Sequence, residues 1–310
     1  MSSIGIDLGG TKIMTVLVED GAVVAKAKKS TPTGGPSEVL DAMAKLVAKV
    51  DPDERAGSIG VGVPGPVIPG SGVLPVAVNI RGWDHDVNVA AGLGERCAGR
   101  RVVVDNDVNV GTFAESRAGA GAGVDNLLGV FMGTGVGAGL VIDGRLRQGP
   151  RGIAGELGHA YVAFREFDSA AVGRGELEDY AGRRMMEARA RSLHAEGEPT
   201  ALVDLVGENR MKSSTWEKAL DAGDALAARI VDDAADAMAS ALASAIALVD
   251  IELVVLGGGM AERLGEPFRA DLERRLEQRA FAGVTAPVRS ATLGDTGGAL
   301  GAALLTEESQ

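Results

Sequence analysis

The sequence predicts a two-lobed α/β fold, and three observations lead to this class. The chain has 310 residues, of which 45% are hydrophobic, and this is enough to bury two cores. Apolar runs of strand length alternate with segments of helical spacing, which is typical of α/β proteins. One pattern of three strands, joined by a glycine turn and an Asp-Gly hairpin turn, occurs twice. A duplicated β-meander is therefore expected, one copy in each lobe.

The first copy of the meander begins at Ser3 and runs IGIDLGG, TKIMTVLVE, Asp20-Gly21 and AVVAKAK. The second copy begins at Leu127 and runs LLGVFMG, TGVGAGLVI, Asp143-Gly144 and RLRQG. The order and the approximate lengths of the strands agree. A gene duplication explains why both copies place glycines at the first turn, and similar turns are expected to do similar work.

The segments around the second meander supply the rest of the α/β pattern. Residues 37–50 form an amphipathic helix, followed by the strand SIGVGVPG, the segment NIRGW and the strand-like VVVDND. After the second meander the chain becomes helical, and residues 225–248 carry apolar side chains at helical spacing before the strand IELVVLGGG. The periodicity of residues 225–248 predicts a buried core helix without a chemical role.

The stretch VVVDNDVNVG at residues 102–111 is unusual, because three valines of a buried strand lead directly into a polar cluster. Asp105, Asn106, Asp107 and Asn109 lie within five positions. These residue types cap helices, and helical spacing resumes at Val110, so a strand-to-helix turn accounts for them. A functional site at the end of the strand accounts for them equally well. The stretch alone leaves both interpretations open.

Charge and composition exclude several classes of function. The formal net charge is -12, and the arginines at positions 183, 184, 189 and 191 alternate with apolar residues as on a solvated helix face, so a nucleic-acid partner is not expected. Cys97 is the only cysteine and there are three histidines, which excludes an internal disulfide and leaves little for structural zinc. No apolar run reaches the length of a membrane span and no signal peptide is visible, so a cytoplasmic protein with no membrane partner is expected.

Three glycine turns could hold phosphate, because a residue without Cβ lets backbone N–H groups approach an anion. The candidate turns are Gly9-Gly10-Thr11-Lys12, Gly133-Thr134-Gly135 and Gly257-Gly258-Gly259. None matches the P-loop or the dinucleotide-binding fingerprint. Together with the carboxylate of Asp7 at the first turn, they indicate a nucleotide held between two lobes.

The motifs of the chain resemble those of the ROK family of repressors and sugar kinases. They are, in order, GIDLGGTK, GVGVPGPV, NIRGW, VDNDVN, GTGVGAG, AGELGH, GELEDYAG and VVLGGG. The resemblance implies the two-lobed actin/hexokinase-like (ribonuclease H-like) α/β fold, with sugar and ATP in an interlobe cleft and a homodimer as the assembly. It implies a small lobe at residues 1–116, a large lobe at residues 117–295 and a terminal helix at about residues 296–310 that packs back on the small lobe.

The resemblance also implies which residues bind sugar. Asp107 is similar to the family's catalytic aspartate, which accepts the proton of the sugar hydroxyl, and this favours the functional interpretation of the polar cluster. Asp105 stands where a glutamate is expected. The sugar-binding residues implied by the resemblance are Gly65, Asn79, Asn106, Asp107, Glu156, His159 and Glu178. Glu156 and His159 are three positions apart, so they share a face of one helical turn.

On the nucleotide side, the resemblance implies Mg²⁺ bound through the ATP phosphates and by Asp7 through water. The residues expected to bind ATP or its phosphates are Asp7, Gly9, Gly10, Thr11, Lys12, Gly133, Thr134, Gly135, Gly257, Gly258 and Gly259. Polyphosphate in place of ATP stays open as the donor.

The chain departs from the family at its zinc loop, which has the form C-x-C-G-x-x-G-C-x-E. The aligned residues are SAAVGRGELE, with Ser169, Ala171 and Glu176 at the cysteine positions. His159 alone remains of the four ligands that structural zinc requires, so no zinc is expected. Packing of Tyr161, Phe164 and Phe167, together with charge pairs among Arg165, Glu166, Asp168, Arg174 and Glu176, is then expected to hold residues 163–178.

The leading hypothesis is an ATP-dependent hexose kinase that forms a sugar 6-phosphate, with glucose as the first substrate. An amino sugar such as N-acetylglucosamine, N-acetylmannosamine or kanosamine is the alternative substrate. A sugar-binding ROK protein without catalysis is a second alternative, but it would be expected to lose Asp107 or the phosphate turns, and both are present. A repressor would carry a DNA-binding helix-turn-helix before the first glycine turn, where only six residues precede Asp7.

Overall fold

The computed structural model describes residues 2–77, 80–163 and 173–308. The chain forms two compact units. Unit 1 comprises Met1–Asp125, Gly139–Gly155 and Thr292–Gln310, and unit 2 comprises Asn126–Ala138 and Glu156–Ala291. The lobe boundaries inferred from the family resemblance stay a prediction.

Unit 1 is built on a five-stranded sheet with the order β3-β2-β1-β4-β7. Its strands are β1 (Ser2–Leu8), β2 (Lys12–Glu19), β3 (Ala22–Ser30), β4 (Ser58–Val63) and β7 (Arg101–Asn106). β1 pairs antiparallel with β2 and parallel with β4, so the predicted first meander is confirmed. At its hairpin turn, Asp20 and Gly21 have φ of 50° and 78°, the left-handed conformation that a two-residue turn requires.

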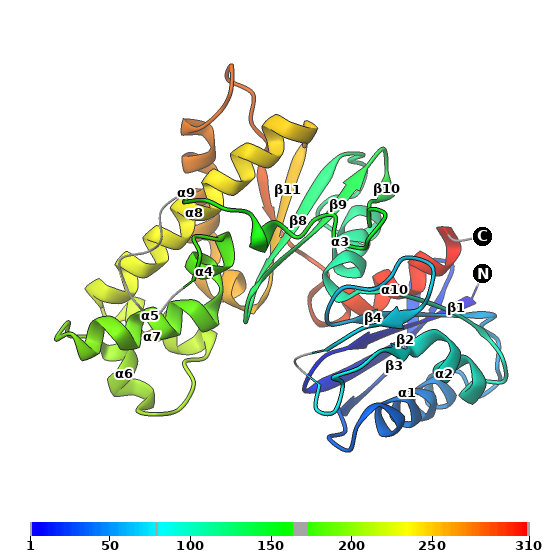
Figure 1. The fold of residues 1–310 in the computed structure, drawn as a ribbon. Helices are drawn as coiled ribbons and strands as arrows, with labels where there is room; N and C mark the ends of the chain where they lie inside the picture. Colours follow the sequence, from blue (N-terminus) through cyan, green and yellow to red (C-terminus); the bar gives the residue numbers. More distant parts are fainter. Residues whose placement is uncertain (1, 78–79, 164–172, 309–310) are drawn as a thin grey trace. The chain divides into compact units, whose positions relative to one another are not determined.

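Helices cover both faces of this sheet, with α1 and α2 on one face and α3 and α10 on the other (Figure 1). The helices are α1 (Pro36–Val50), α2 (Val89–Arg96), α3 (Asp107–Ala118) and α10 (Gly297–Glu308), and η2 (Gly294–Thr296) precedes α10. A small sheet of β5 (Val73–Leu74) and β6 (Val87–Asn88) lies beside them. A core cluster fills the space under α1 and α2, with Ile4, Leu8, Met43 and Leu93 fully buried.

α10 packs so closely on the sheet that it excludes side chains from two strand positions. A Cβ added to Gly5 would lie 1.8 Å from the carbonyl oxygen of Ala299, and one added to Gly60 would lie 1.7 Å from that of Ala302. The chain that leads into α10 is held by Glu115 of α3, whose buried carboxylate accepts the N–H of Thr292 at 2.8 Å. Residues distant in the sequence therefore complete the core of unit 1.

The second sheet has the order β10-β9-β8-β11-β12. Its strands are β8 (Leu127–Met132), β9 (Val136–Ile142), β10 (Arg145–Leu146), β11 (Leu253–Gly257) and β12 (Val288–Ser290). β11 runs parallel to both β8 and β12. The predicted second meander is confirmed, with Asp143 and Gly144 at φ of 54° and 68°, although its third strand has only two residues.

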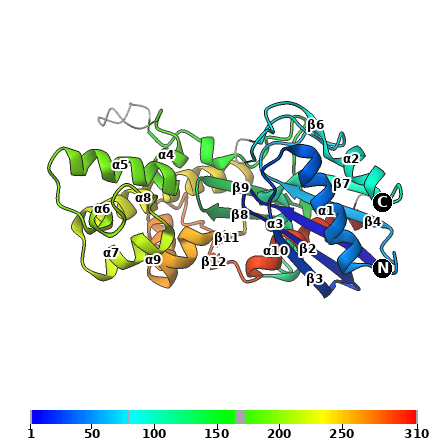
Figure 2. The ribbon, with the colours of Figure 1, turned by 90° about the horizontal axis from the view of Figure 1, so that it is seen from below.

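Unit 2 is mostly helical. It contains η1 (Leu157–His159), α4 (Leu177–Ala181), α5 (Arg183–Ala195), α6 (Ala201–Val206), α7 (Ser213–Asp221), α8 (Ala225–Val249) and α9 (Gly259–Gln278). α9 packs on β8, β11 and β12, α8 packs on α4 and α9, and α5, α6 and α7 gather at the end of unit 2 away from its strands (Figure 2). The predicted helix at residues 225–248 is confirmed as α8, with eleven buried residues along its inner face.

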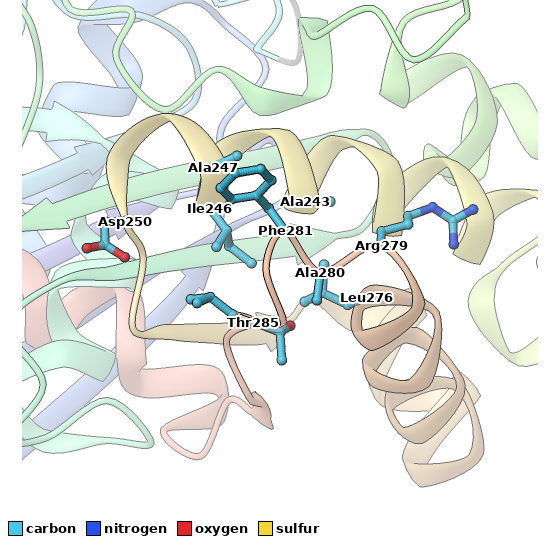
Figure 3. Close-up of a pocket in the computed structure, with 10 residues that line it drawn as sticks. Ala243, Ile246, Ala247, Asp250, Leu276, Arg279, Ala280, Phe281 and Thr285 are labelled. Atoms are coloured by element: carbon cyan, nitrogen blue, oxygen red, sulfur yellow. The ribbon is translucent and has the colours of Figure 1, made fainter.

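A mainly apolar groove of about 320 Å³ lies where α8 and α9 end. The ring of Phe281 stands over α8 next to Ala247, although 80% of this residue is exposed (Figure 3). None of the residues that line the groove belongs to the predicted sugar or phosphate sites. Among the described residues, no helix combines the length and the apolar character needed to cross a bilayer.

Candidate active site

The polar cluster after β7 begins with a helix cap. Asn106 is the N-cap of α3, and its Oδ1 accepts the N–H groups of Val108 at 2.9 Å and Asn109 at 3.2 Å. Its Nδ2 donates to the carbonyl oxygen of Gly65 at 3.1 Å. Because an amide nitrogen carries two N–H donors, Asn106 can cap the helix and still offer one donor to a ligand. The two interpretations of the sequence are therefore compatible.

Asp105 is the buried anchor of this cluster. It is 2% exposed, and its Oδ1 accepts the N–H of Asn106 at 2.7 Å and Nδ2 of Asn109 at 3.0 Å. Its Oδ2 accepts Nε2 of Gln148 at 2.7 Å. Burial raises the pKa of Asp105, and these three hydrogen bonds oppose the rise. Asp105 thus fixes the direction in which its neighbours point.

Asp107 is the first residue of α3 and is only partly buried. Its Oδ1 accepts the N–H of Val108 at 2.9 Å. The N-terminus of a helix of twelve residues favours negative charge, because unpaired N–H groups and aligned peptide dipoles meet there. The local structure therefore orients the Asp107 side chain at the start of α3, where negative charge is favoured.

Gly65, another predicted sugar-binding residue, has a backbone conformation that would be strained in any residue with a side chain. Its φ is 119°, and an added Cβ would lie 3.0 Å from the carbonyl oxygen of Val76. This conformation aims its own carbonyl at Asn106, so Gly65 lies beside the polar cluster in unit 1. Asn79, predicted for the same loops, lies outside the described residues.

Unit 2 brings three of the predicted sugar-binding side chains into one electrostatic group. Glu156 immediately precedes η1, and burial raises its pKa. The charge of His159 lowers this pKa, and the charge of Glu178 raises it further. The expected shared turn of Glu156 and His159 is confirmed as a short 3₁₀ helix.

His159 forms an ion pair with Glu176, whose Oε2 lies 2.8 Å from its Nδ1. The hydrogen bond to Glu176 is the main cause that raises the pKa of His159 above its ordinary value. Glu176 stands at a cysteine position of the family's zinc loop. A carboxylate at this position thus contacts the imidazole directly.

Asp179 fastens the backbone of the same segment. It is 9% exposed, and its Oδ2 accepts three N–H groups, from Arg174 at 2.7 Å, Gly175 at 2.9 Å and Glu176 at 3.0 Å. The backbone of Val162 also donates to Gly175 at 2.9 Å. These contacts, which the sequence did not reveal, hold the end of the loop that presents Glu178.

The prediction that Tyr161 packs the loop is wrong, because this residue is 64% exposed and contributes through a backbone bridge to Glu176. Phe164 and Phe167, and the cysteine positions of Ser169 and Ala171, lie outside the described residues. Within the part of the chain that is described, no three side chains of His, Cys, Asp or Glu converge as metal ligands do. The absence of zinc stays a prediction.

Glu178 connects the candidate sugar residues to a candidate phosphate turn. Its Oε2 accepts the N–H of Val136 at 2.8 Å. A Cβ added to Gly135 would lie 2.1 Å from the same oxygen, so a larger residue would displace the carboxylate from this position. Glu178 therefore shapes the Gly133–Gly135 turn as well as facing Glu156 electrostatically.

The Gly133–Gly135 turn is pinned by the start of α5. The carbonyl oxygen of Gly133 accepts the N–H of Arg183 at 3.2 Å, and that of Thr134 accepts the N–H of Arg184 at 3.0 Å. The C=O and N–H of one trans peptide point in opposite directions. The N–H groups of Thr134 and Gly135 therefore point away from α5, as a turn that cradles phosphate requires.

The first glycine turn, in unit 1, is closed by its own backbone. Gly9 donates to the carbonyl oxygen of Lys12 at 2.9 Å, while Gly10 and Thr11 at the tip are exposed. Lys12 Nζ pairs with Asp295 at 3.2 Å. Burial raises the pKa of Asp7 at the end of β1, and Lys12 opposes this rise. A bound cation would favour the ionised carboxylate of Asp7, so its surroundings fit a role beside Mg²⁺.

The third glycine turn leads from β11 into α9. Gly258 is the N-cap of α9 with a φ of 90°, and an added Cβ would lie 2.5 Å from the carbonyl oxygen of Met132. Gly257 ends the strand and Gly259 begins the helix. The turn therefore leads into the N-terminal N–H groups of α9, which suit an anion.

The ROK family model matches residues 3–309 of the chain. The chain belongs to the ROK family. A glucokinase of Thermotoga maritima is 32% identical over 311 residues, which cover 98% of this ROK chain and 97% of the relative. An N-acetylgalactosamine kinase of Shewanella sp. strain ANA-3 is 33% identical over 310 residues, which cover 97% of this chain and 95% of the relative.

A solved structure of a ROK family glucokinase from Streptomyces griseus, in complex with glucose and AMPPNP, has a TM-score of 0.80 with this chain. The two are 29% identical, and the match covers 99% of this chain and 100% of the other. This similarity confirms the predicted actin/hexokinase-like α/β fold for the present ROK protein.

The prediction of a solvated arginine face in this ROK chain is wrong for Arg183 and Arg189. The arginines of α5 were expected to form a solvated face, but the guanidinium of Arg183 donates to Thr134 Oγ1 at 3.1 Å and to the carbonyl oxygen of Met211 at 2.6 Å. Arg189 is likewise largely buried, paired with Asp233 at 2.7 Å. Both arginines contact residues that are remote in the sequence, so their alternation with apolar residues does not indicate exposure to solvent.

Proposed function

We propose that this ROK-family protein is an ATP-dependent hexose kinase that transfers the γ-phosphate to the 6-hydroxyl of its sugar, with glucose as the leading substrate. The observation that carries the proposal is the oriented carboxylate of Asp107 at the start of α3, in a chain that aligns over nearly its whole length with a glucokinase. Supporting observations come from both units, each of which holds a glycine turn suited to phosphate.

Asp107 acts as the general base of the transfer. It accepts the proton of the 6-hydroxyl as the oxygen forms its bond to the γ-phosphorus, and ADP leaves with the electrons of the broken P–O bond. The second N–H of Asn106 Nδ2 donates to a neighbouring sugar oxygen. The carbonyl oxygen of Gly65 supports this arrangement by accepting the first N–H of Asn106 Nδ2.

Glu156, His159 and Glu178 orient the sugar. Carboxylate oxygens accept hydrogen bonds from sugar hydroxyls. Because Nδ1–H of His159 donates to Glu176, Nε2 accepts from a sugar hydroxyl in the neutral ring and donates to a sugar oxygen in the protonated ring. Glu178 keeps one oxygen on the backbone of Val136 and offers the other to the substrate. Orientation of this kind lowers the barrier by holding the hydroxyl in line with the phosphate.

The glycine turns bind the donor. The N–H groups of Thr134 and Gly135 hold phosphate oxygens, and Lys12 with the turn at Gly10 and Thr11 provides further donors. Gly257, Gly258 and Gly259 approach the adenosine part of the donor in this proposal. Mg²⁺, held by the phosphates and through water by Asp7, would neutralise the charge that develops during transfer.

An amino sugar is the second candidate substrate, favoured by the 33% identity to an N-acetylgalactosamine kinase. A coupled assay of ADP release over glucose, N-acetylglucosamine, N-acetylmannosamine, N-acetylgalactosamine and kanosamine separates the candidates. Glucose is expected to give the highest kcat/KM. A higher value for an amino sugar would reassign the substrate, and no release with any of them would refute the kinase.

The donor and the assembly complete the proposal. Formation of sugar 6-phosphate is compared with ATP and with polyphosphate at equal phosphate concentration, and ATP is expected to be preferred. Light scattering during gel filtration is expected to show a homodimer. A dominant polyphosphate activity, or a monomer at micromolar concentration, would contradict the respective part.

A further inference from the structure

α5 contacts the Gly133–Gly135 turn in two ways, of which only one is explained by helix geometry. Its first N–H groups hold the carbonyls of Gly133 and Thr134, as the start of any helix can do. In addition, Arg183 extends its guanidinium to the side chain of Thr134, with Nη2 at 3.1 Å from Oγ1. The same guanidinium is anchored by Nη1 on the carbonyl oxygen of Met211 at 2.6 Å.

The chemistry of the two side chains fixes the direction of this hydrogen bond. A guanidinium has five N–H donors and no acceptor, so Thr134 Oγ1 must accept from Arg183. The hydroxyl proton of Thr134 is then directed away from Arg183 and can only be donated to another group. A hydroxyl that accepts from a cation is also a stronger donor, because hydrogen bonds in a chain polarise one another.

We propose that Arg183 is a positioning residue for the phosphoryl donor, which fixes the Thr134 hydroxyl as a hydrogen-bond donor toward a phosphate oxygen. The inference rests on the proposed function and assigns a role to a residue outside the glycine turns. Thr134 is exposed, and its N–H and that of Gly135 point away from α5, so all three donors are available to one phosphate group.

The charge of Arg183 serves the same purpose. The protein has a formal net charge of -12, which opposes the approach of a polyanion. The other cation at a predicted phosphate turn, Lys12, is already paired with Asp295. The printed contacts of the Arg183 guanidinium are both to neutral oxygens, so its positive charge is not compensated by them.

A purely structural role of Arg183, as a tie between α5 and Met211, makes a different prediction. Loss of that tie would lower stability and weaken binding of every ligand alike. A role through Thr134 affects phosphate recognition specifically and vanishes when the hydroxyl is absent. A double-mutant cycle distinguishes the two.

The experiment measures ADP and adenosine binding by calorimetry, without sugar, for the wild type, Arg183→Met, Thr134→Val and the double variant. The Kd of ADP is expected to rise about tenfold in each single variant, the effect of losing a hydrogen bond to a charged group. The double variant is expected to equal Thr134→Val, and adenosine, which lacks phosphates, is expected to bind unchanged. The KM of ATP should rise in parallel, with the KM of the hexose constant.

Arg210→Gln is the matched control, because it removes an exposed positive charge one residue from Met211. It is expected to leave the Kd of ADP unchanged. Multiplicative effects of Arg183→Met and Thr134→Val, equal losses for adenosine and ADP, or an unchanged Kd of ADP in Arg183→Met would each overturn the inference. If the wild type itself fails to bind ADP, the proposed kinase function fails instead, so the two failures are distinguishable.

Discussion

Asn106 illustrates how one side chain meets two demands at once. Its Oδ1 caps α3 while its Nδ2 reaches Gly65, and the second hydrogen of that nitrogen remains available to a ligand. A polar residue at a strand end therefore does not have to be either structural or functional. Because Asn106 is the N-cap, the next residue, Asp107, is the first residue of α3.

Asp107→Asn is expected to keep the fold and sugar binding but to lower kcat by at least ~10²-fold, because an amide cannot accept the hydroxyl proton. Steady-state kinetics, sugar calorimetry and thermal melting measure the three quantities. Asp53→Asn, which changes an exposed aspartate, serves as the control and should match the wild type. A kcat within a factor of three of the wild type would remove Asp107 from the mechanism.

Sugar binding is expected to weaken on acidification earlier than an ordinary glutamate would cause. Burial raises the pKa of Glu156 above 4.5, and only its ionised form accepts two sugar hydroxyls. The hexose KM should therefore rise as pH falls through this raised pKa, starting above pH 4.5. In Glu156→Gln the KM should be higher at neutral pH and flatter below it. An identical acid limb in both proteins would contradict this assignment.

The His159–Glu176 pair is expected to make stability depend on pH in the neutral range. The folded pKa of His159 is raised above 6.5, so the stabilisation is fully present below pH 6.5 and is lost as pH rises through the folded value. Glu176→Gln should lower the pKa of His159 and flatten this dependence. Because the chain has three histidines, NMR of labelled imidazoles resolves them, with His159→Gln giving the assignment. An unchanged titration in Glu176→Gln would refute the pairing in solution.

Much of the candidate site was predictable at the level of single motifs. Glycines, Asp107 and Glu178 occur in short local patterns, and their chemistry follows from residue type. Gln148 and Arg183 were not predictable, because they reach Asp105 and Thr134 across 43 and 49 positions of sequence. Such contacts depend on tertiary packing, which leaves no periodic signal in a single sequence.

At the scale of elements, the Asp179 carboxylate is expected to stabilise the backbone of the segment before α4. Asp179→Asn weakens three charge-assisted hydrogen bonds, at a cost of about 2 kcal/mol. Hydrogen exchange of the amides of Arg174, Gly175 and Glu176 should accelerate, while that of α8 stays slow. Asp221→Asn at the end of α7 is the control. Unchanged exchange at the three amides would show that other contacts suffice.

Metal removal tests whether the same segment depends on zinc. With Glu176 paired to His159 and Asp179 hydrogen-bonded to the backbone, the segment is expected to need no zinc. A zinc-selective chelator followed by Mg²⁺ should leave both Tm and kinase activity unchanged. About one zinc per chain by elemental analysis, with activity lost on its removal, would disprove the expectation.

The regular elements were predicted well, and the irregular ones were not. α8 and both meanders follow strong periodicity and turn signals. The break of α9 at Gly265, which has a φ of 66°, is marked only by a glycine two residues before Pro267. The third strand of the second meander is shorter than its sequence pattern predicted, because hydrogen-bonded pairing with β9 extends over two residues only.

At the scale of the molecule, the docking of α10 is expected to be indispensable to unit 1. Gly60→Ala would place a methyl group 1.7 Å from the carbonyl oxygen of Ala302, and displacing the helix should cost about 3 kcal/mol, the upper end of the usual overpacking range. Gly57→Ala is the matched control, since an added Cβ there meets no atom within 4 Å. Denaturant unfolding of both variants measures the difference. Equal midpoints would show that α10 can shift without loss.

The return of the chain to unit 1 has a consequence for how the protein is made. Glu115 of α3 accepts hydrogen bonds from the N–H groups of Thr292 and Leu293, and the glycines of β1 and β4 are covered by α10. On the ribosome, every residue of unit 2 is synthesised before these partners arrive. Unit 1 therefore keeps the apolar face of β1 and β4 uncovered until α10 has been synthesised and can dock on it. The unit whose synthesis starts first therefore obtains its last structural element only after every residue of unit 2 has been made.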